Sequence, residues 1–246
     1  MLANRYGDRA GDDLRRIIAS NPVFAAMGAP QLDAIAGASD YIECQRGHTL
    51  FERGDEASDC FQVVSGRVGL ISCAIGRRPC MVAIRIPQQL FGDLSLFDSR
   101  PRAASAKTLE SCTLLRIPYA PLRAVLVEEP HLLWGFLSSF AGKVRHANDL
   151  LADALAVELL TRLARRLLEI AGPDDAFTLD ITQEEMASLV GASRERTNKA
   201  LSTLVKSGAI SINSRNYRIT DRDLLARYGR HFRAASATPD HSSDLK

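Results

Sequence analysis

The chain has 246 residues, of which 46% are hydrophobic and 24% are charged, and its formal net charge is +2. This composition is that of an ordinary globular protein with enough apolar residues for one large core or two smaller ones. It contains no run of about 18 apolar residues and no signal-peptide pattern, so we expect a cytoplasmic protein with no membrane partner.

The first 118 residues predict short helices followed by a β-rich domain. Residues 12–36 carry apolar side chains at helical spacing, interrupted at Asn21-Pro22 and Ala29-Pro30. From about residue 40 to 118, glycine-containing turns separate short apolar runs that read FQVVSG, RVGLISCAI, MVAIRI and CTLLRI. Many short strands with frequent turns indicate a sandwich, roll or barrel rather than a parallel sheet.

A long amphipathic helix is predicted after Pro118. Its apolar residues are spaced alternately four and three apart, which is an a/d heptad pattern. They are Leu133, Leu137, Phe140, Val144, Ala147, Leu151 and Ala154. We expect this stripe to pair with the same stripe of a second copy in a parallel homodimer; the alternative is that it packs on the chain's own β-rich domain.

The remaining elements are predicted to form a small C-terminal module. A helix from Glu158 to Ile170 ends at the stop signal Ala171-Gly172-Pro173. Beyond it the sequence predicts a strand (Phe177 to Asp180), two helices, a hairpin (Ala209 to Ser211 with Tyr217 to Ile219) and a last helix from Asp221. The small, polar end, residues 234–246, is predicted to be disordered.

The segment ITQEEMASLVGASRERTNKALSTLVKSGAI carries the strongest functional signal. Thr182 and Glu185 form a capping box at the start of one helix, Gly191 suits a left-handed turn at its end, and Ser193 caps a second helix. The two helices can pack through apolar Met186, Leu189, Val190, Ala200, Leu201 and Leu204. This is helix-turn-helix spacing, although an ordinary helical hairpin with a charged face is the alternative.

The start of the second helix has side chains suited to reading base edges. Arg194 can fork onto guanine, Glu195 can accept from cytosine, and Lys199, one turn along, can reach a guanine or a phosphate. Residues 181–233 contain ten Lys/Arg against five acidic residues, a net charge of +5 within a chain of +2. This local excess indicates a polyanionic partner for the C-terminal module.

Together these features resemble the cyclic-AMP receptor protein / fumarate-nitrate regulator (CRP/FNR) family of bacterial transcription factors over roughly residues 14 to 230. TQEEMASLVGASRERTNKAL is similar to the family's recognition motif, and RGHTLFERGDEASDCFQVVSGRVGL to its first sensor strands. The resemblance implies an α+β chain of four parts. They are N-terminal helices with a cyclic-nucleotide-binding-like β-roll (jelly roll), residues 1–118; a long dimerisation helix and hinge, 119–156; a winged helix-turn-helix, 157–233; and the tail.

For DNA, the resemblance places Arg194, Glu195 and Lys199 at the base-reading positions, with Lys199 where the best-known members have Arg. It implies a palindrome of TGTGA-like half-sites. The neighbouring positions assigned to the same interface are Thr182, Gln183, Ser193 and Arg196.

For an effector, the stretch GDLSLFDSRPRAASA, residues 92–106, resembles the family's phosphate-binding cassette. The positions carried over are Gly92, Asp93, Leu94, Ser95, Arg102 and Ala103. Asp93 replaces the usual Glu, and Ala103 stands where cyclic-AMP binders have Ser or Thr. Ala147 likewise replaces a Thr that contacts the purine, and the neighbouring Asn148 of the second copy is the polar group that could substitute for it.

The effector is left open at this point. The pocket could hold cyclic AMP or another cyclic nucleotide weakly, hold another small molecule, or stay empty with Arg102 paired to Asp93 or Asp98.

Five cysteines (Cys44, Cys60, Cys73, Cys80 and Cys112) show no C-x-x-C pair and predict neither a metal site nor a disulfide framework. Thiol sensing stays open; His48, His131 and His146 lack a spacing that argues for haem.

The sequence therefore predicts a homodimeric, sequence-specific transcriptional regulator whose partners are double-stranded DNA, a second copy and, by resemblance, RNA polymerase. The alternatives are a ligand-independent regulator of the same family and a cyclic-nucleotide-binding module that signals through protein contacts. No arrangement of nucleophile and base or phosphate-transfer loop indicates an enzyme.

Overall fold

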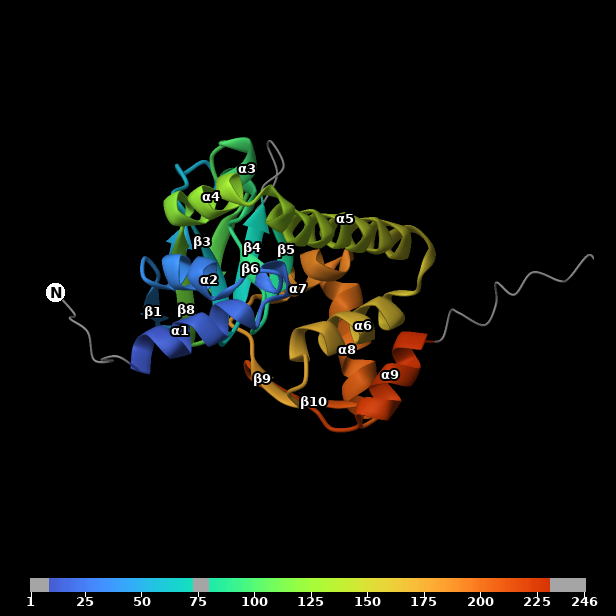
Figure 1. Ribbon diagram of the computed structural model, residues 1–246. Coiled ribbons are helices and arrows are strands. Elements are labelled where there is room, and N and C mark those ends of the chain that lie inside the picture. The colour runs from blue at the N-terminus through green and yellow to red at the C-terminus, as the bar shows by residue number, and fades with distance from the viewer. Residues whose placement is uncertain (1–8, 73–79, 231–246) are drawn as a thin grey trace, which may run out of the picture.

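The computed structural model describes residues 9–72 and 80–230. Within them, the chain forms a β-roll flanked by helices, a long helix that extends from the roll, and a C-terminal module of helices and a small sheet (Figure 1). This confirms the predicted α+β fold class. The tail predicted to be disordered, residues 234–246, lies outside the described residues.

Two antiparallel four-stranded sheets form the roll, in the orders β1-β8-β3-β6 and β2-β7-β4-β5. Phe61, Val63, Val68, Phe91 and Leu114 are buried together in the roll, as expected for two stacked sheets that each face the other with one side. The strands are β1 (Asp40–Cys44), β2 (Thr49–Phe51), β3 (Asp59–Ser65), β4 (Val68–Ser72), β5 (Cys80–Arg85), β6 (Leu90–Phe91), β7 (Ser105–Thr108) and β8 (Cys112–Pro118).

Short helices pack against the roll and share a second core with it. As predicted, they are interrupted at prolines; Asn21 caps the 3-10 turn that begins at Pro22 by accepting from the Val23 amide at 3.0 Å. The buried residues Ile18, Phe24 and Leu122 belong to this core. The helices are α1 (Arg9–Ala19), η1 (Pro22–Phe24), α2 (Ala29–Ala36) and α4 (Tyr119–Glu128).

The helical segment after Pro118 is not continuous, which corrects the expectation of one long helix over residues 119–156. Helix α4 ends at Glu128, a short 3-10 turn η2 (Pro130–Leu132) follows, and α5 runs from Leu133 to Ala156. Pro130 lacks an amide hydrogen and disfavours a helical conformation at Glu129, whose φ and ψ are −127° and 77°. The long helix therefore begins at Leu133, the first residue of the heptad pattern.

Helix α5 is anchored by one face of its first turns, while most of its heptad stripe is exposed. Phe136 is buried and meets Phe24 edge to face, with 5.8 Å between ring centroids. By contrast, Leu137, Val144 and Leu151 of the heptad stripe are 52%, 60% and 62% exposed. Leu133 and Phe140 of the stripe pack against the core that the roll shares with its flanking helices, so the chain covers part of the stripe itself and leaves the rest exposed.

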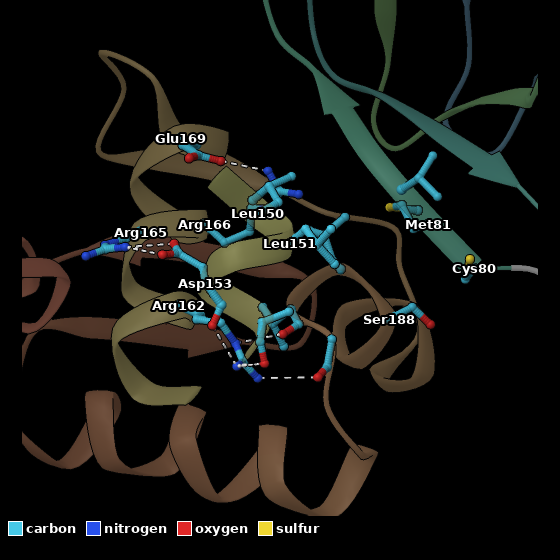
Figure 2. Close-up of a pocket in the computed structure, with 15 residues that line it drawn as sticks. Cys80, Met81, Leu150, Leu151, Asp153, Arg162, Arg165, Arg166, Glu169 and Ser188 are labelled. Atoms are coloured by element: carbon cyan, nitrogen blue, oxygen red, sulfur yellow. Dashed lines mark hydrogen bonds and ion pairs between the residues drawn. The ribbon is translucent and has the colours of Figure 1, made fainter. Parts of the chain in front are cut away.

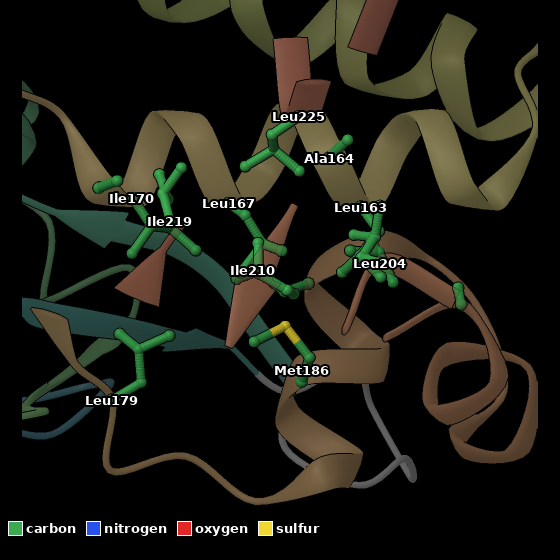
Figure 3. Packing of buried hydrophobic residues seen from close by; sticks show 14 of the residues in the cluster. Leu163, Ala164, Leu167, Ile170, Leu179, Met186, Leu204, Ile210, Ile219 and Leu225 are labelled. Atoms are coloured by element: carbon green, nitrogen blue, oxygen red, sulfur yellow. The ribbon is translucent and has the colours of Figure 1, made fainter. Parts of the chain in front are cut away.

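The C-terminal module has its own core between helices and a three-stranded sheet of order β10-β11-β9 (Figure 3). Leu163 and Leu167 of one helix pack with Met186, Leu204 and Ile210 in this core. The elements are α6 (Leu159–Ala171), β9 (Ala176–Thr178), α7 (Gln183–Val190), α8 (Arg194–Lys206), β10 (Ile210–Asn213), β11 (Asn216–Ile219) and α9 (Arg222–Arg230). Each predicted element of the module is present, within a few residues of its predicted bounds.

The roll and the C-terminal module are joined by a buried arginine. Arg67, whose side chain is 6% exposed, donates from Nε to the Ile170 carbonyl at 2.9 Å and from Nη2 to the Ala171 carbonyl at 3.2 Å. Its Nη1 pairs with Glu110 at 2.7 Å. A cation at the C-terminus of α6 satisfies carbonyls that the helix leaves unpaired and interacts favourably with the helix dipole.

Arg67→Met is expected to lower the free energy of unfolding by about 2 to 4 kcal/mol, because it leaves Glu110 and two carbonyls without their buried donor. Urea titration measures the effect. Arg116→Met is the matched control: Arg116 forms a two-bond ion pair with Asp40, but at 44% and 48% exposure, so its loss should cost less than about 1 kcal/mol. Equal losses in the two variants would show that Arg67 does not hold the domains together.

Candidate nucleic-acid interface and effector pocket

The predicted capping of the two helices in the helix-turn-helix segment is confirmed. The Thr182 hydroxyl accepts from the Glu185 amide at 3.1 Å, and the Glu185 carboxylate accepts from the Thr182 amide at 2.6 Å. Gly191 ends α7 in the left-handed conformation, with φ 65° and ψ 47°, and Ser193 caps α8 through the Arg196 amide. These local bonds fix the turn that orients α8 against α7.

The first turns of α8 present charged side chains away from the module's core. Arg194, Glu195, Arg196 and Lys199 are exposed, while Thr197 between them is buried and donates to the Ser193 carbonyl at 3.0 Å. The four charged residues therefore lie on the outward side of a helix whose inward side is fixed. This is the arrangement that a helix entering the major groove requires.

Gln183, at the start of α7, orients two of these outward side chains. Its Oε1 accepts from Arg194 Nε at 2.8 Å and from Asn198 Nδ2 at 3.0 Å. Sequence reasoning missed Asn198, although its position four residues after Arg194 places it on the same face of the helix. Holding Arg194 by Nε leaves its two terminal nitrogens able to donate to a base edge or a phosphate.

A β-hairpin follows α8 and carries further basic residues. Strands β10 and β11 pair from Ile210–Ile219 to Asn213–Asn216, and β10 packs beside α8. Arg215 and Arg218 of this hairpin are exposed. Arg215 Nε lies 3.0 Å from the Asp180 carboxylate, which holds the tip of the hairpin in place. The hairpin is the wing that the resemblance to a winged helix-turn-helix implies.

In the roll, the cassette is organised around a glycine and an arginine. Helix α3 (Leu94–Asp98) follows Gly92, which has φ 74°. A Cβ at Gly92 would lie 2.6 Å from Arg102 Nη1. Only glycine therefore permits both this backbone conformation and the close approach of the guanidinium.

Arg102 is almost completely buried, with 4% of its side chain exposed. Its Nη1 donates to the carbonyls of Asp59 at 2.8 Å and Gly92 at 3.0 Å, and its Nη2 pairs with the Asp59 carboxylate at 2.6 Å. The guanidinium also lies over the Phe51 ring, 4.1 Å from its centroid. Its Nε is buried without a hydrogen-bond partner. Neither acid that the sequence offered for this arginine, Asp93 or Asp98, is its partner.

Asp93 instead pairs with the long helix. The Asp93 carboxylate is buried and accepts from Lys143 Nζ of α5 at 2.6 Å. Sequence reasoning missed Lys143 as part of the pocket; its position one turn before Ala147 on the same helix was the available signal. This ion pair connects the cassette to the helix that carries the heptad stripe.

Tyr119 closes the base of the cassette. Its hydroxyl donates to the Gly92 carbonyl and lies 3.3 Å from Arg102 Nη1. Burial is the main cause that raises the pKa of Tyr119, to about 12. The phenol therefore keeps its proton at neutral pH and acts as a donor to the main chain beside Arg102.

These residues surround a cavity of about 390 Å³ between the cassette and α5. Asp93, Ser95 and Arg102 are buried in its wall, whereas Leu94 and Ala103 are exposed at its edge. Val144 and Ala147 of the heptad stripe line the opposite side. Asn148 is exposed and is not part of the lining within one chain, so a contact from the partner's Asn148 stays a prediction.

A second, smaller cavity of about 260 Å³ lies where α5 ends beside α6, α7 and β5 (Figure 2). Arg162 of α6 dominates this junction: it donates to the Ala154 and Val157 carbonyls at 3.0 Å and to the Val190 carbonyl at 3.1 Å. Arg165 adds a two-bond ion pair with Asp153 at 2.7 and 2.8 Å. These bonds connect the end of α5 directly to the turn of the helix-turn-helix.

Three of the four described cysteines are poor candidates for thiol chemistry; the fourth, Cys80, is half-buried. Cys44, Cys60 and Cys112 are buried, and burial is the main cause that raises the pKa of each thiol, in Cys112 to about 11. Such thiols stay protonated at neutral pH, and the thiol is the unreactive form. Cys73 lies outside the described residues, in which no three His, Cys, Asp or Glu gather into a group that could hold a metal ion.

Comparison with known protein families gives one match in the C-terminal module and one in the roll. Residues 161–228 match the family described as Crp-like helix-turn-helix domain, and residues 41–129 match the cyclic nucleotide-binding domain family. A CRP-like cAMP-activated global transcriptional regulator of Mycobacterium tuberculosis (strain ATCC 25618 / H37Rv) is 32% identical over 221 residues, covering 87% of this chain and 99% of the relative. The cyclic AMP receptor protein of Thermus thermophilus is 27% identical over 206 residues, covering 83% and 95%.

Solved structures share the fold. FixK2 from Bradyrhizobium japonicum aligns with a TM-score of 0.65 at 19% identity, covering 77% of this chain and 96% of that chain. A transcriptional regulator of the CRP/FNR family from Thermus thermophilus aligns with a TM-score of 0.62 at 21% identity, covering 77% and 98%. In the described part of this chain, no helix has both the length and the apolar character to span a membrane.

Proposed function

This chain belongs to the CRP/FNR family of transcriptional regulators, and from that premise we propose that it acts as a homodimer that reads a palindrome of TGTGA-like half-sites. The observation that carries the proposal is the outward face of α8. Arg194, Glu195 and Lys199 lie exposed on a capped helix, with Arg194 held by Gln183 in an orientation that leaves its terminal nitrogens available. Such side chains match the donor and acceptor pattern of G·C pairs in the major groove.

The dimer forms through α5. Its exposed apolar stripe, which includes Leu137, Val144 and Leu151, is the surface that a second copy covers. Pairing along this stripe gives two recognition helices related by a two-fold axis. Half-sites one turn of DNA apart, about 34 Å, then follow from the symmetry of the protein.

We assign the roll cavity to a cyclic nucleotide, with cyclic AMP as the first candidate because it is named in the relatives' descriptions. The buried, unpartnered Nε of Arg102 supports an anionic ligand, because an unmatched buried donor is costly unless an acceptor arrives. Gly92, Asp93, Leu94 and Ser95 line the same cavity. Ala103 contributes no hydroxyl, so the affinity should be lower than in a pocket that has one.

A ligand in this cavity can act on DNA binding through α5. Lys143 of α5 pairs with Asp93 in the wall of the cavity, and Arg162 of α6 bonds to the far end of α5 and to the end of α7, so α5 connects the cassette to the helix-turn-helix. A nucleotide shifts the population of the dimer only if it binds one arrangement of these helices better than the other. The regulator acts in the cytoplasm, contacts RNA polymerase and catalyses no reaction.

The test is an electrophoretic mobility shift with the full-length protein and a labelled palindrome of TGTGA half-sites, with and without cyclic AMP or cyclic GMP. The expected result is tighter binding to the palindrome than to a scrambled duplex of equal length, at a salt concentration that suppresses phosphate-only contacts. Equal binding to both duplexes would refute the DNA assignment. Calorimetry with each nucleotide tests the pocket separately: no heat at millimolar nucleotide refutes the effector assignment alone.

A further inference from the structure

Asp59 brings a second negative charge to the anion-binding arginine. It is the first residue of β3, forty-three positions before Arg102, and its side chain is 19% exposed. Its carboxylate lies 2.6 Å from Arg102 Nη2, while its carbonyl accepts from Arg102 Nη1. Both the charge and the backbone of Asp59 therefore act on the same guanidinium.

The other carboxylates of the cassette are engaged elsewhere. Asp93 pairs with Lys143, and Asp98 Oδ1 accepts from the Arg100 amide at 3.0 Å. Within residues 9–72 and 80–230, Asp59 is the carboxylate that forms an ion pair with Arg102. Arg102 therefore pairs with Asp59 and not with the two carboxylates of the cassette, Asp93 and Asp98.

The contacts divide the guanidinium into a paired side and an open side. Arginine has five N–H donors in a fixed fork. The Nη1 donors go to the carbonyls of Asp59 and Gly92, with the Tyr119 hydroxyl 3.3 Å from the same nitrogen, and Nη2 gives one donor to the Asp59 carboxylate. Nε, although buried, has no acceptor. A phosphate in the cavity can bind the open side, formed by Nε and the remaining donor of Nη2, but it must then lie close to the Asp59 carboxylate.

The surroundings make that proximity costly. The ring of Phe51 lies 4.1 Å and that of Phe61 5.8 Å from the Arg102 guanidinium carbon, measured to the ring centroids. Apolar rings exclude water, and in a low local dielectric like charges repel more strongly. Ala103 offers no hydroxyl to offset the repulsion, so a bound phosphate depends largely on an arginine that is already neutralised.

We propose that Asp59 determines the ligand affinity of this pocket: it is an intramolecular counterion that weakens the binding of a cyclic nucleotide by repelling the phosphate on Arg102. The inference rests on the proposed assignment of the cavity to a cyclic nucleotide. Asp59 thereby raises the nucleotide concentration needed to fill the pocket. A residue outside the cassette, at the start of β3, sets the threshold of the response.

The test is calorimetric titration of the full-length protein with cyclic AMP and with cyclic GMP, in wild type and in Asp59→Asn. Asparagine keeps the size and an oxygen that can accept from Nη2, but removes the charge. The dissociation constant of the nucleotide should fall by about tenfold to a hundredfold, the scale of one charge-assisted contact. Asp59→Ser, which removes the charge with a different shape, should shift the affinity in the same direction, and it carries the test if Asp59→Asn does not fold.

Two controls isolate the mechanism. Asp40→Asn removes a carboxylate from another ion pair of the roll, with Arg116, which is exposed and does not line the cavity; it should leave the dissociation constant unchanged. Adenosine, used as a competitor, has the base and ribose of cyclic AMP without the phosphate. Asp59→Asn should not tighten adenosine binding, because the repulsion acts on the phosphate.

The outcomes separate this inference from the assignment of the pocket. Nucleotide binding that is measurable in the wild type and tighter in the variants, with adenosine unaffected, supports the inference. A wild type that binds nucleotide as well as or better than both variants refutes the role of Asp59 and leaves the pocket assignment intact. Equal tightening of adenosine and nucleotide refutes the electrostatic mechanism, and no binding in any variant refutes both statements.

Discussion

Arg194→Ala is expected to weaken binding to a duplex with two inverted TGTGA half-sites by about thirtyfold or more, while changing binding to an unrelated duplex much less. A bidentate contact to a base discriminates by about 1 to 3 kcal/mol. A palindrome presents the contact twice, at sites far enough apart for the losses to add, which gives about 2 to 6 kcal/mol. Fluorescence anisotropy with labelled duplexes measures both affinities.

The control for this variant is Arg227→Ala. Arg227 is also exposed and basic, but it lies on α9, which packs against α6 rather than beside α8 in the module. It should change binding to both duplexes slightly and equally, because it contributes only to the general attraction of a polyanion. If Arg194→Ala behaved like Arg227→Ala, α8 would not be the element that reads bases.

The second large effect is expected from charging the exposed stripe of α5. In Leu137→Glu/Leu151→Glu, two leucines that are 52% and 62% exposed in one chain become acidic. A dimer would lose their burial on both helices, at about 1.5 to 3 kcal/mol for each fully buried leucine, and place like charges opposite each other. The dimer dissociation constant should rise by at least a thousandfold. In sedimentation velocity the variant should then sediment as a monomer.

Val127→Glu provides the matched control for dimerisation. Val127 is 72% exposed, on α4, which is separated from the stripe by the turn at Pro130. This variant should remain a dimer and keep its affinity for the palindrome. Retention of the dimer in Leu137→Glu/Leu151→Glu would place the interface on another surface.

The features that sequence reasoning predicted correctly depend on residues close together in the chain. The Thr182–Glu185 capping box, the left-handed Gly191 and the Ser193 cap all involve bonds within about four residues. The seven positions from Leu133 to Ala154 follow one helical period and lie on the single helix α5. Where the prediction was wrong, at the expected long helix from residue 119, the break is also local, because Pro130 disfavours a helical conformation at Glu129.

The contacts that define the pocket could not be predicted in this way. Arg102 meets Asp59 across forty-three positions, Asp93 meets Lys143 across fifty, and Arg67 reaches the end of α6 across more than a hundred. No periodicity or short motif connects such pairs, because their proximity follows from the pairing of the strands and the docking of two domains. The sequence therefore located the cassette but not the charges that balance Arg102.

The most direct test of the central claim, a symmetric dimer that reads two half-sites, is the dependence of affinity on half-site spacing. Fluorescence anisotropy would compare duplexes whose half-site centres lie one helical turn apart with duplexes carrying about five additional base pairs between them, with and without millimolar cyclic AMP. The insertion turns the second half-site to the opposite face of the DNA. The account predicts that affinity falls to that of a single half-site; equal affinity for the two spacings would contradict it.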